Sequence, residues 1–163
     1  MKTAKNPTSA RSKVKNGSMS IASAASPASL YEVDETAWLD AMAELCARKQ
    51  AQALDLEHLS EYLSDMARRD RREVYSRLFV LMTHLLKWDH QPRMQTCSWR
   101  ATIGHQRLEL RLLLDSKALL NHARQILADV YVDARKQAAT ETELKLSTFP
   151  KECPWEIDDL LHD

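Results

Sequence analysis

The chain has 163 residues, of which 44% are hydrophobic, and its 23 basic side chains balance its 23 acidic ones. This length is enough for one domain with a substantial core, and no apolar run approaches the roughly 18 residues of a membrane span. Only two glycines are present, and Ala, Leu, Glu, Arg and Lys are abundant, which favours helix. Strand and hairpin signals are missing, so the composition predicts a soluble all-α protein.

The balanced charge hides a difference between the two ends of the chain. Residues 1–29 carry five basic side chains and no acidic one, so residues 30–163 carry 18 basic against 23 acidic groups. The first segment is rich in Ser, Ala, Lys and Pro and cannot bury enough apolar surface to offset its ordering entropy. We therefore expect a disordered basic tail at 1–29 and a single helical domain at 30–163. The acidic domain weighs against a dedicated nucleic-acid binder.

The three cysteines are Cys46, Cys97 and Cys153, which lie far apart and form no C-x-x-C pair. This spacing argues against a disulfide framework and against a zinc site, and it fits a reducing cytoplasm. We expect ordinary thiols, no bound metal and no cofactor.

Two helices are predicted in the first part of the domain. The first covers 34–49, with Asp34 as its N-cap residue. The second begins after Asp55 and ends near Arg68 or Arg69. Its apolar face consists of Leu56, Leu59, Tyr62, Leu63 and Met66.

The third predicted helix starts at Asp70 and should be the centre of the fold. Asp70 and Glu73 resemble a capping box, and Pro92 ends the helix. At about 100° per residue, nine large apolar side chains share one half of the circumference. They are Val74, Tyr75, Leu78, Phe79, Leu81, Met82, Leu85, Leu86 and Trp88. An arc this wide exceeds the stripe of a helix with one neighbour, so we expect several helices to pack around it.

The remaining predicted helices cover about 98–114, capped by Ser98, and about 117–140. The segment after them contains two prolines that cannot continue a helix. We expect it to pack over the bundle through Phe149 and Trp155 and to end in a short helix. The predicted architecture is an all-α bundle of about five main helices around a central helix at about 70–90, plus a short C-terminal helix.

Several motifs occur in a fixed order along residues 30–161, and as a set they are specific. They are Leu30-Tyr31-Glu32-x-Asp34 with Ala37-Trp38, Ser76-Arg77-Leu78, His84-Leu85-Leu86-Lys87-Trp88 followed by Gln91-Pro92, Ser98-Trp99-x-x-Thr102-Ile103-x-x-Gln106-Arg107, Ala134-Arg135, Glu141-Thr142, and Phe149-Pro150-x-x-Cys153-Pro154. In these motifs the chain resembles the bacterial family known as domain of unknown function 29. The resemblance implies an all-helical fold and implies no activity.

The chain departs from this family pattern at two positions. Ala67 stands where the family usually has Gly, which should soften the break between the second and third helices. Trp155 stands where Tyr is usual, and we expect little effect on packing.

One candidate site lies at the corner between the third and fourth predicted helices. Its aromatic and polar side chains are His84, Trp88, Gln91, Arg93, Trp99 and Gln106. Such a cluster could bind a ligand or a partner. It could equally be a packed corner whose indole N–H groups and buried amide need hydrogen-bond partners, and the sequence favours this structural interpretation.

Two arginine clusters are candidates for binding phosphate groups. Arg100, Arg107 and Arg111 share one side of the fourth helix. The second cluster, at the junction of the second and third helices, consists of Arg68, Arg69, Arg71 and Arg72. The alternative, which the acidic domain favours, is a solvated face whose ion pairs are each worth about 0–1 kcal/mol.

Catalytic and metal-binding patterns are weak. No phosphate-binding glycine loop and no G-x-S-x-G motif occurs, and the His and Glu residues lack the Glu-x-x-His pairs of bundle metal sites. We predict no catalytic residue and no metal ligand set. The leading hypothesis is a cytoplasmic interaction or regulatory module that binds protein, either a partner or itself, since Leu108 and Leu112 lie off the core stripe of their helix. The alternatives are a nucleic-acid-associated protein using the arginine clusters, and a metal- or ligand-dependent enzyme; we expect no membrane association.

Overall fold

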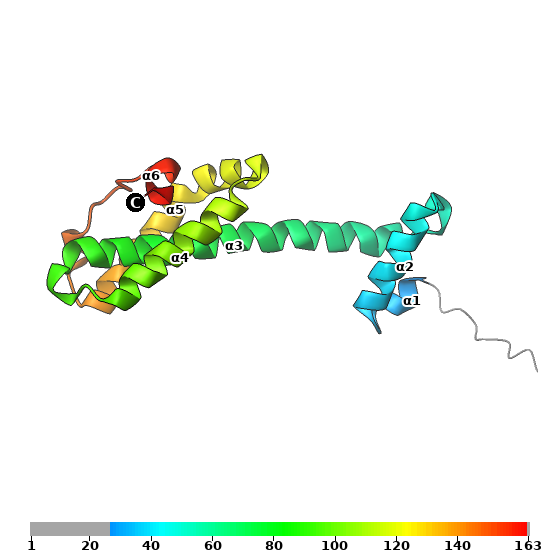
Figure 1. The fold of residues 1–163 in the computed structure, drawn as a ribbon, viewed down its shortest axis with the longest axis horizontal. Helices are drawn as coiled ribbons and strands as arrows, with labels where there is room; N and C mark the ends of the chain where they lie inside the picture. The colour runs from blue at the N-terminus through cyan, green and yellow to red at the C-terminus, as the bar shows by residue number, and fades with distance from the viewer. Residues whose placement is uncertain (1–26, 163) are drawn as a thin grey trace, which may run out of the picture. The chain divides into compact units, whose positions relative to one another are not determined.

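The computed structural model of the chain describes residues 27–162, and within this range it contains helices and no strand, which confirms the all-α prediction. The α-helices in Figure 1 are α1 (Pro27–Tyr31), α2 (Glu35–Ala47), α3 (Leu56–His90), α4 (Cys97–Leu113), α5 (Lys117–Thr142) and α6 (Ile157–Leu161). Short 3-10 helices are η1 (Ala51–Ala53), η2 (Pro92–Met94) and η3 (Leu146–Thr148). The predicted disordered tail lies outside the described residues, except that its last three positions begin α1. The chain divides into two compact units between His58 and Leu59, within the first turn of α3.

The first unit is built around Trp38, whose side chain is completely buried. Its indole N–H donates a hydrogen bond to the Asp55 carboxylate at 3.2 Å, and the ring of Tyr31 packs edge-on against it at 4.9 Å. The same Asp55 carboxylate lies 2.7 Å from Nδ1 of His58. Asp34 caps α2 as predicted, by accepting a backbone hydrogen bond of 3.0 Å from three residues further on. The motif residues of this part of the chain therefore hold one small core together.

The structure corrects the predicted break at residues 69 and 70. One helix of 35 residues replaces the second and third predicted helices. The region contains no Gly or Pro, and Ala67 has the highest helix propensity of any residue. A capping residue does not end a helix whose backbone hydrogen bonds can continue through it. Asp70 is therefore an exposed residue in the interior of α3 and not an N-cap.

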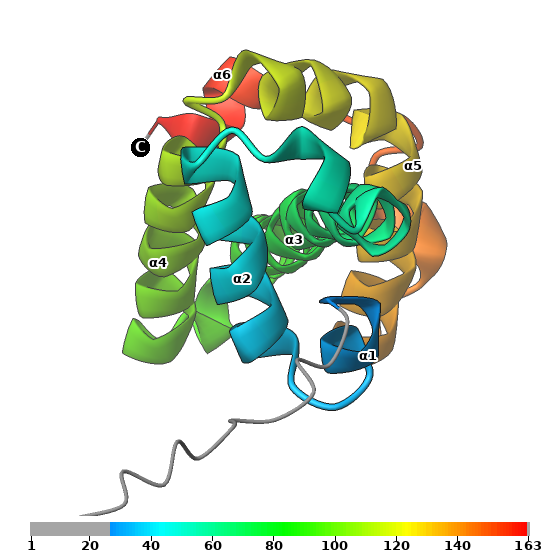
Figure 2. The ribbon, with the colours of Figure 1, turned by 90° about the vertical axis from the view of Figure 1, so that its right-hand side faces the viewer.

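The C-terminal half of α3 is the centre of the second unit. Its fully buried apolar side chains are Val74, Leu78, Leu81, Met82 and Leu86. They belong to one core with residues of α4, α5 and α6, and Figures 1 and 2 show these three helices around this part of α3. Burial of each such side chain stabilises the fold by about 1.5–3 kcal/mol. The predicted central helix is thus confirmed for residues 74–90, while residues 70–73 are exposed.

The last turns of α3 are more enclosed than their sequence suggested. Thr83 and Lys87 lie on the polar side of the helix, yet their exposed fractions are only 2% and 7%. The Thr83 hydroxyl donates a hydrogen bond of 2.7 Å to the Phe79 carbonyl within the same helix. Lys87 needs a partner from elsewhere because a buried unpaired ammonium is very costly.

The helices that surround α3 begin close to the predicted positions. The N-cap of α4 is Thr96, whose hydroxyl accepts a hydrogen bond from the Trp99 amide at 3.3 Å, so the predicted cap at Ser98 is wrong by two residues. After α5, Phe149 is buried and Trp155 packs against the core. This confirms the predicted covering segment, which leads into α6.

The predicted apolar face of the second helix is the clearest mismatch in burial. Leu56, Leu63 and Met66 are exposed by 64%, 57% and 45%, and no residue from Ser60 to Glu73 is buried.

Among residues 27–162, every helix is too short or too polar to span a lipid bilayer.

Candidate functional site

The buried Lys87 joins three helices near the predicted corner. Its ammonium lies 2.5 Å from the Glu141 carboxylate of α5 and 4.6 Å from the centre of the Trp99 ring of α4. The first contact is a charge-assisted hydrogen bond, and the second is a cation–π interaction. Desolvation acts to raise the pKa of Glu141, but hydrogen bonds from Lys87 and Gln137 outweigh it and hold this pKa below its ordinary value. Through these contacts Lys87 connects α3 to both α4 and α5.

Sequence reasoning missed Lys87 and Glu141 as central residues. Lys87 occupies the polar arc of its helix, and Glu141 lies 54 residues away, beyond any spacing rule for a single helix. The sequence indicated these two residues only indirectly. Lys87 belongs to the family motif His84–Trp88, and Glu141 belongs to the family motif Glu141-Thr142.

Other predicted corner residues also bond within the fold. The Gln91 amide donates to the Thr142 carbonyl at the end of α5 over 3.1 Å. The Gln106 side chain is buried and accepts from the Arg77 guanidinium at 3.4 Å, which supplies the partner that a buried amide requires. Nδ1 of His84 lies 2.8 Å from the Val80 carbonyl in the same helix. Arg93 is exposed on η2.

A surface groove between the end of α3 and α4 brings together members of both predicted sites. Its volume is about 340 Å³, and it is lined by Leu85, Trp88, Asp89, Arg100, Ile103 and Arg107. The apolar side chains form most of the surface, and the guanidinium of Arg100 lies 5.5 Å from the centre of the Trp88 ring. Trp88 from the predicted corner and Arg100 and Arg107 from the predicted ridge therefore share one concave surface, which we call the α3–α4 groove.

The three arginines of the predicted ridge have different surroundings. Nε of Arg107 donates to the Leu160 carbonyl at 3.1 Å, and Nη1 of Arg111 donates to the Leu161 carbonyl at 3.4 Å. These two bonds stabilise the C-terminal end of α6, where cations also interact favourably with the helix dipole. Arg100 is exposed and makes its cation–π contact at the edge of the groove. Two of the three ridge arginines, Arg107 and Arg111, therefore attach α6 to α4.

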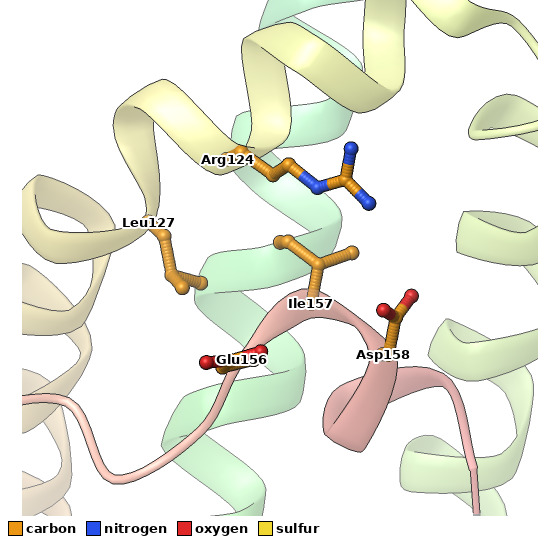
Figure 3. Close-up of a pocket in the computed structure, with 5 residues that line it drawn as sticks. All are labelled: Arg124, Leu127, Glu156, Ile157 and Asp158. Carbon is orange, nitrogen blue, oxygen red and sulfur yellow. The ribbon is translucent and has the colours of Figure 1, made fainter.

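A smaller pocket lies between α5 and the start of α6 (Figure 3) and has a volume of about 210 Å³. Arg124 and Leu127 line it from α5, and Glu156, Ile157 and Asp158 from the other side. Glu156 is already engaged as the N-cap of α6, with its backbone N–H bonded to Asp159 at 2.8 Å. We therefore assign this pocket to the joint between the two helices.

The side chains that can bind metals are dispersed over residues 27–162. In that range no three His, Cys, Asp or Glu side chains are placed together to hold an ion. His105 and Glu109, one turn apart on α4, do not change this, because Glu109 faces the Arg77 guanidinium at 3.5 Å.

Comparison with known proteins gives one match. Residues 30–163 match the family described as domain of unknown function DUF29. Neither the curated proteins nor the solved structures include one similar to this chain. The motif residues that first indicated the family mostly bond within the fold, as Lys87, Gln91, Gln106 and Arg107 do.

Proposed function

The chain belongs to the DUF29 family, whose function is unknown, and we propose that it is a small helical module that binds a protein partner in the α3–α4 groove. The observation that carries this proposal is an apolar surface bordered by guanidinium groups. Leu85, Trp88 and Ile103 provide the apolar part, and Arg100 and Arg107 the cationic border. Concave apolar surfaces with a few placed polar groups are the usual form of binding sites.

The chemistry of the groove defines the part of the partner that it would hold. A volume of about 340 Å³ accommodates one or two side chains rather than a large cofactor. Two arginines against one Asp89 leave a net positive border. We therefore propose an acidic segment of the partner, with one large apolar side chain inserted beside Trp88 and its carboxylates facing Arg100.

Nucleic acid is a weaker candidate for the same surface. Polyanion binding depends on many exposed cations acting together. Two of the three ridge arginines donate to the carbonyls of Leu160 and Leu161, and the domain as a whole is acidic. A short acidic segment needs only the local positive border.

A cytoplasmic location is part of the proposal. Cys46, Cys97 and Cys153 are all free thiols, and the first two are exposed. Exposed unpaired thiols are typical of a reducing compartment.

The experiment is a binding titration with labelled short peptides. One peptide carries a Trp flanked by Glu residues, a second replaces the Trp by Gly, and a third replaces each Glu by Lys. We expect saturable binding of the first peptide alone. Arg100→Glu should weaken its affinity by at least about tenfold, because it reverses the charge at the groove border.

Arg69→Glu on α3 provides the matched control, since it makes the same charge change on an exposed residue outside the groove. It should leave the affinity unchanged. A DNA duplex is titrated in parallel. The proposal fails if the acidic peptide does not bind, if both variants lose affinity equally, or if the duplex binds more tightly than the peptide.

A further inference from the structure

A second surface, formed by α3 and α5, has charges of opposite sign at its two ends. Its first part is a shallow groove of about 310 Å³ lined by Arg68, Arg71, Arg72, Tyr75, His122 and Ile126. The three arginines lie within two turns of α3, and all are exposed. Arg68 is paired with Asp65, and Arg71 and Arg72 leave this end of the surface cationic.

The other end of the same surface is acidic. The Tyr75 hydroxyl donates to the Asp133 carboxylate of α5 at 2.7 Å. This hydrogen bond, partial burial, and the charges of Asp133 and Asp129 raise the pKa of Tyr75. Because His122, Ile126, Asp129 and Asp133 are spaced by three or four residues, they follow one side of α5.

The middle of the surface is apolar. Tyr75 is 37% exposed and Ile126 is half-buried between the cationic and acidic ends. Exposed apolar side chains rimmed by charges are typical of interaction surfaces.

Some charges of this surface are already paired: Arg68 forms an ion pair with Asp65, and Asp133 accepts from Lys136 at 3.4 Å as well as from Tyr75. Each end nevertheless keeps one charged side chain without a partner in the part of the chain that the structure describes. The side chains of Arg72 and Asp129 have no hydrogen-bond or ion-pair partner among residues 27–162. Arg71 makes only a long bond of 3.4 Å, to the Ala67 carbonyl. These groups are available to a partner.

We infer that this surface binds a second copy of the same chain across a two-fold axis. A two-fold axis through the apolar middle places the arginines of one copy against Asp129 and Asp133 of the other, and the reverse contact forms at the same time. The surface is complementary to itself in charge, which favours such an encounter. The chain also has no net charge to oppose self-association.

Other occupants fit this surface less well. Asp129 and Asp133 would repel a continuous polyanion such as nucleic acid at one end, and an acidic peptide would meet the same carboxylates. The residues of this surface do not line the α3–α4 groove. A test of self-association is therefore independent of a test of the proposed partner site.

The test uses the full chain and two charge reversals, Arg72→Glu and Asp129→Arg. Both positions are exposed, so circular dichroism and thermal melting should show the wild-type fold. Sedimentation velocity should show a wild-type dimer that dissociates on dilution and at high salt, since salt screens the contacts. Each variant alone should be a monomer, because both of its symmetric contacts then join like charges.

An equimolar mixture of the two variants provides the decisive measurement. In a mixed dimer, one contact joins the two substituted positions with their charges exchanged, and the second contact keeps the native Arg72 and Asp129. Both contacts then join opposite charges, so the mixture should form dimers again. Arg69→Glu, an exposed reversal at a position that does not line this groove, is the control and should remain dimeric.

Three results would overturn the inference. The wild-type chain could remain monomeric at every concentration measured. The two charge reversals could leave the dimer intact, which would place the interface elsewhere. Finally, the variants could become monomeric but fail to associate when mixed, which would show that Arg72 and Asp129 do not face each other.

Discussion

The Lys87 ammonium and the Glu141 carboxylate lie 2.5 Å apart, and the Lys87 side chain is only 8% exposed while that of Glu141 is 35% exposed. The lysine is thus enclosed by the bundle, whereas its partner reaches solvent. Because removing a charge from water costs several kcal/mol unless it is paired, the Lys87 ammonium needs this contact to be buried between α3, α4 and α5.

Removing the carboxylate should therefore destabilise the fold. We expect Glu141→Ala to lower the free energy of unfolding by about 1–3 kcal/mol, measured by urea denaturation at neutral pH. This is below the 3–5 kcal/mol typical of a broken buried pair, because solvent screens the partly exposed carboxylate. Replacing the lysine itself by Met removes the buried charge and keeps the volume, so Lys87→Met should change stability by less than about 1 kcal/mol.

Glu152→Ala is the control for this pair, since Glu152 is exposed and should tolerate the change. If Lys87→Met and Glu141→Ala were equally destabilising, the contact would be a net stabilising ion pair rather than compensation for a buried charge.

The continuity of α3 through residue 70 gives a second prediction. In a helix interior, Ala67→Gly should destabilise the protein by about 1 kcal/mol, and Asp70→Ala should be neutral or stabilising by up to about 0.7 kcal/mol. If a helix began at Asp70, the same Asp70→Ala change would remove an N-cap and cost about 1 kcal/mol. Urea denaturation of the two variants distinguishes these outcomes by the sign of the Asp70→Ala effect.

The contact between His58 and Asp55 predicts how the first unit responds to pH. The hydrogen bond to Asp55 raises the pKa of His58, although partial burial opposes it. Desolvation acts to raise the pKa of Asp55, but hydrogen bonds from His58 and Trp38 outweigh it and hold this pKa below its ordinary value. The pair is therefore an ion pair over the pH range between the two folded-state pKa values.

The direction of each effect on stability follows from linkage. The His58 contribution is fully present below its unfolded pKa of about 6.5 and is lost as pH rises through the folded value. The Asp55 contribution is present above its unfolded pKa of about 3.9 and is lost as pH falls through the folded value. We expect the pair to stabilise the first unit most between about pH 4 and 6.5.

An NMR titration of the His58 ring checks this pH response directly. The ring should titrate above its ordinary range in the wild-type chain, and Asp55→Asn should move the titration to lower pH. Exchange of the Trp38 indole proton should quicken in the same variant, since Asp55 accepts its hydrogen bond. An unchanged His58 titration in Asp55→Asn would contradict the assignment.

The sequence determined the helical class and most helix ends, because these depend on local chemistry. Asp34 caps α2, and α3 ends at His90 two residues before Pro92. The wide apolar arc of Val74–Trp88 correctly indicated the helix around which the second unit packs. The same local rules failed at Asp70, where a favourable capping residue lies in a segment with no helix breaker.

The candidate site depended on the tertiary structure. Spacing along one helix could place Arg100, Arg107 and Arg111 on one side of α4, but it could not show that two of them bond to the end of α6. It also gave no sign that Trp88 and Arg100 border one groove. The burial of Lys87 beside Glu141, and the opposed charges of Arg72 and Asp129, likewise come from side chains on separate helices, far apart in the sequence. Local periodicity is encoded within a few turns of sequence, whereas the partner of a charge is decided only when separate helices pack.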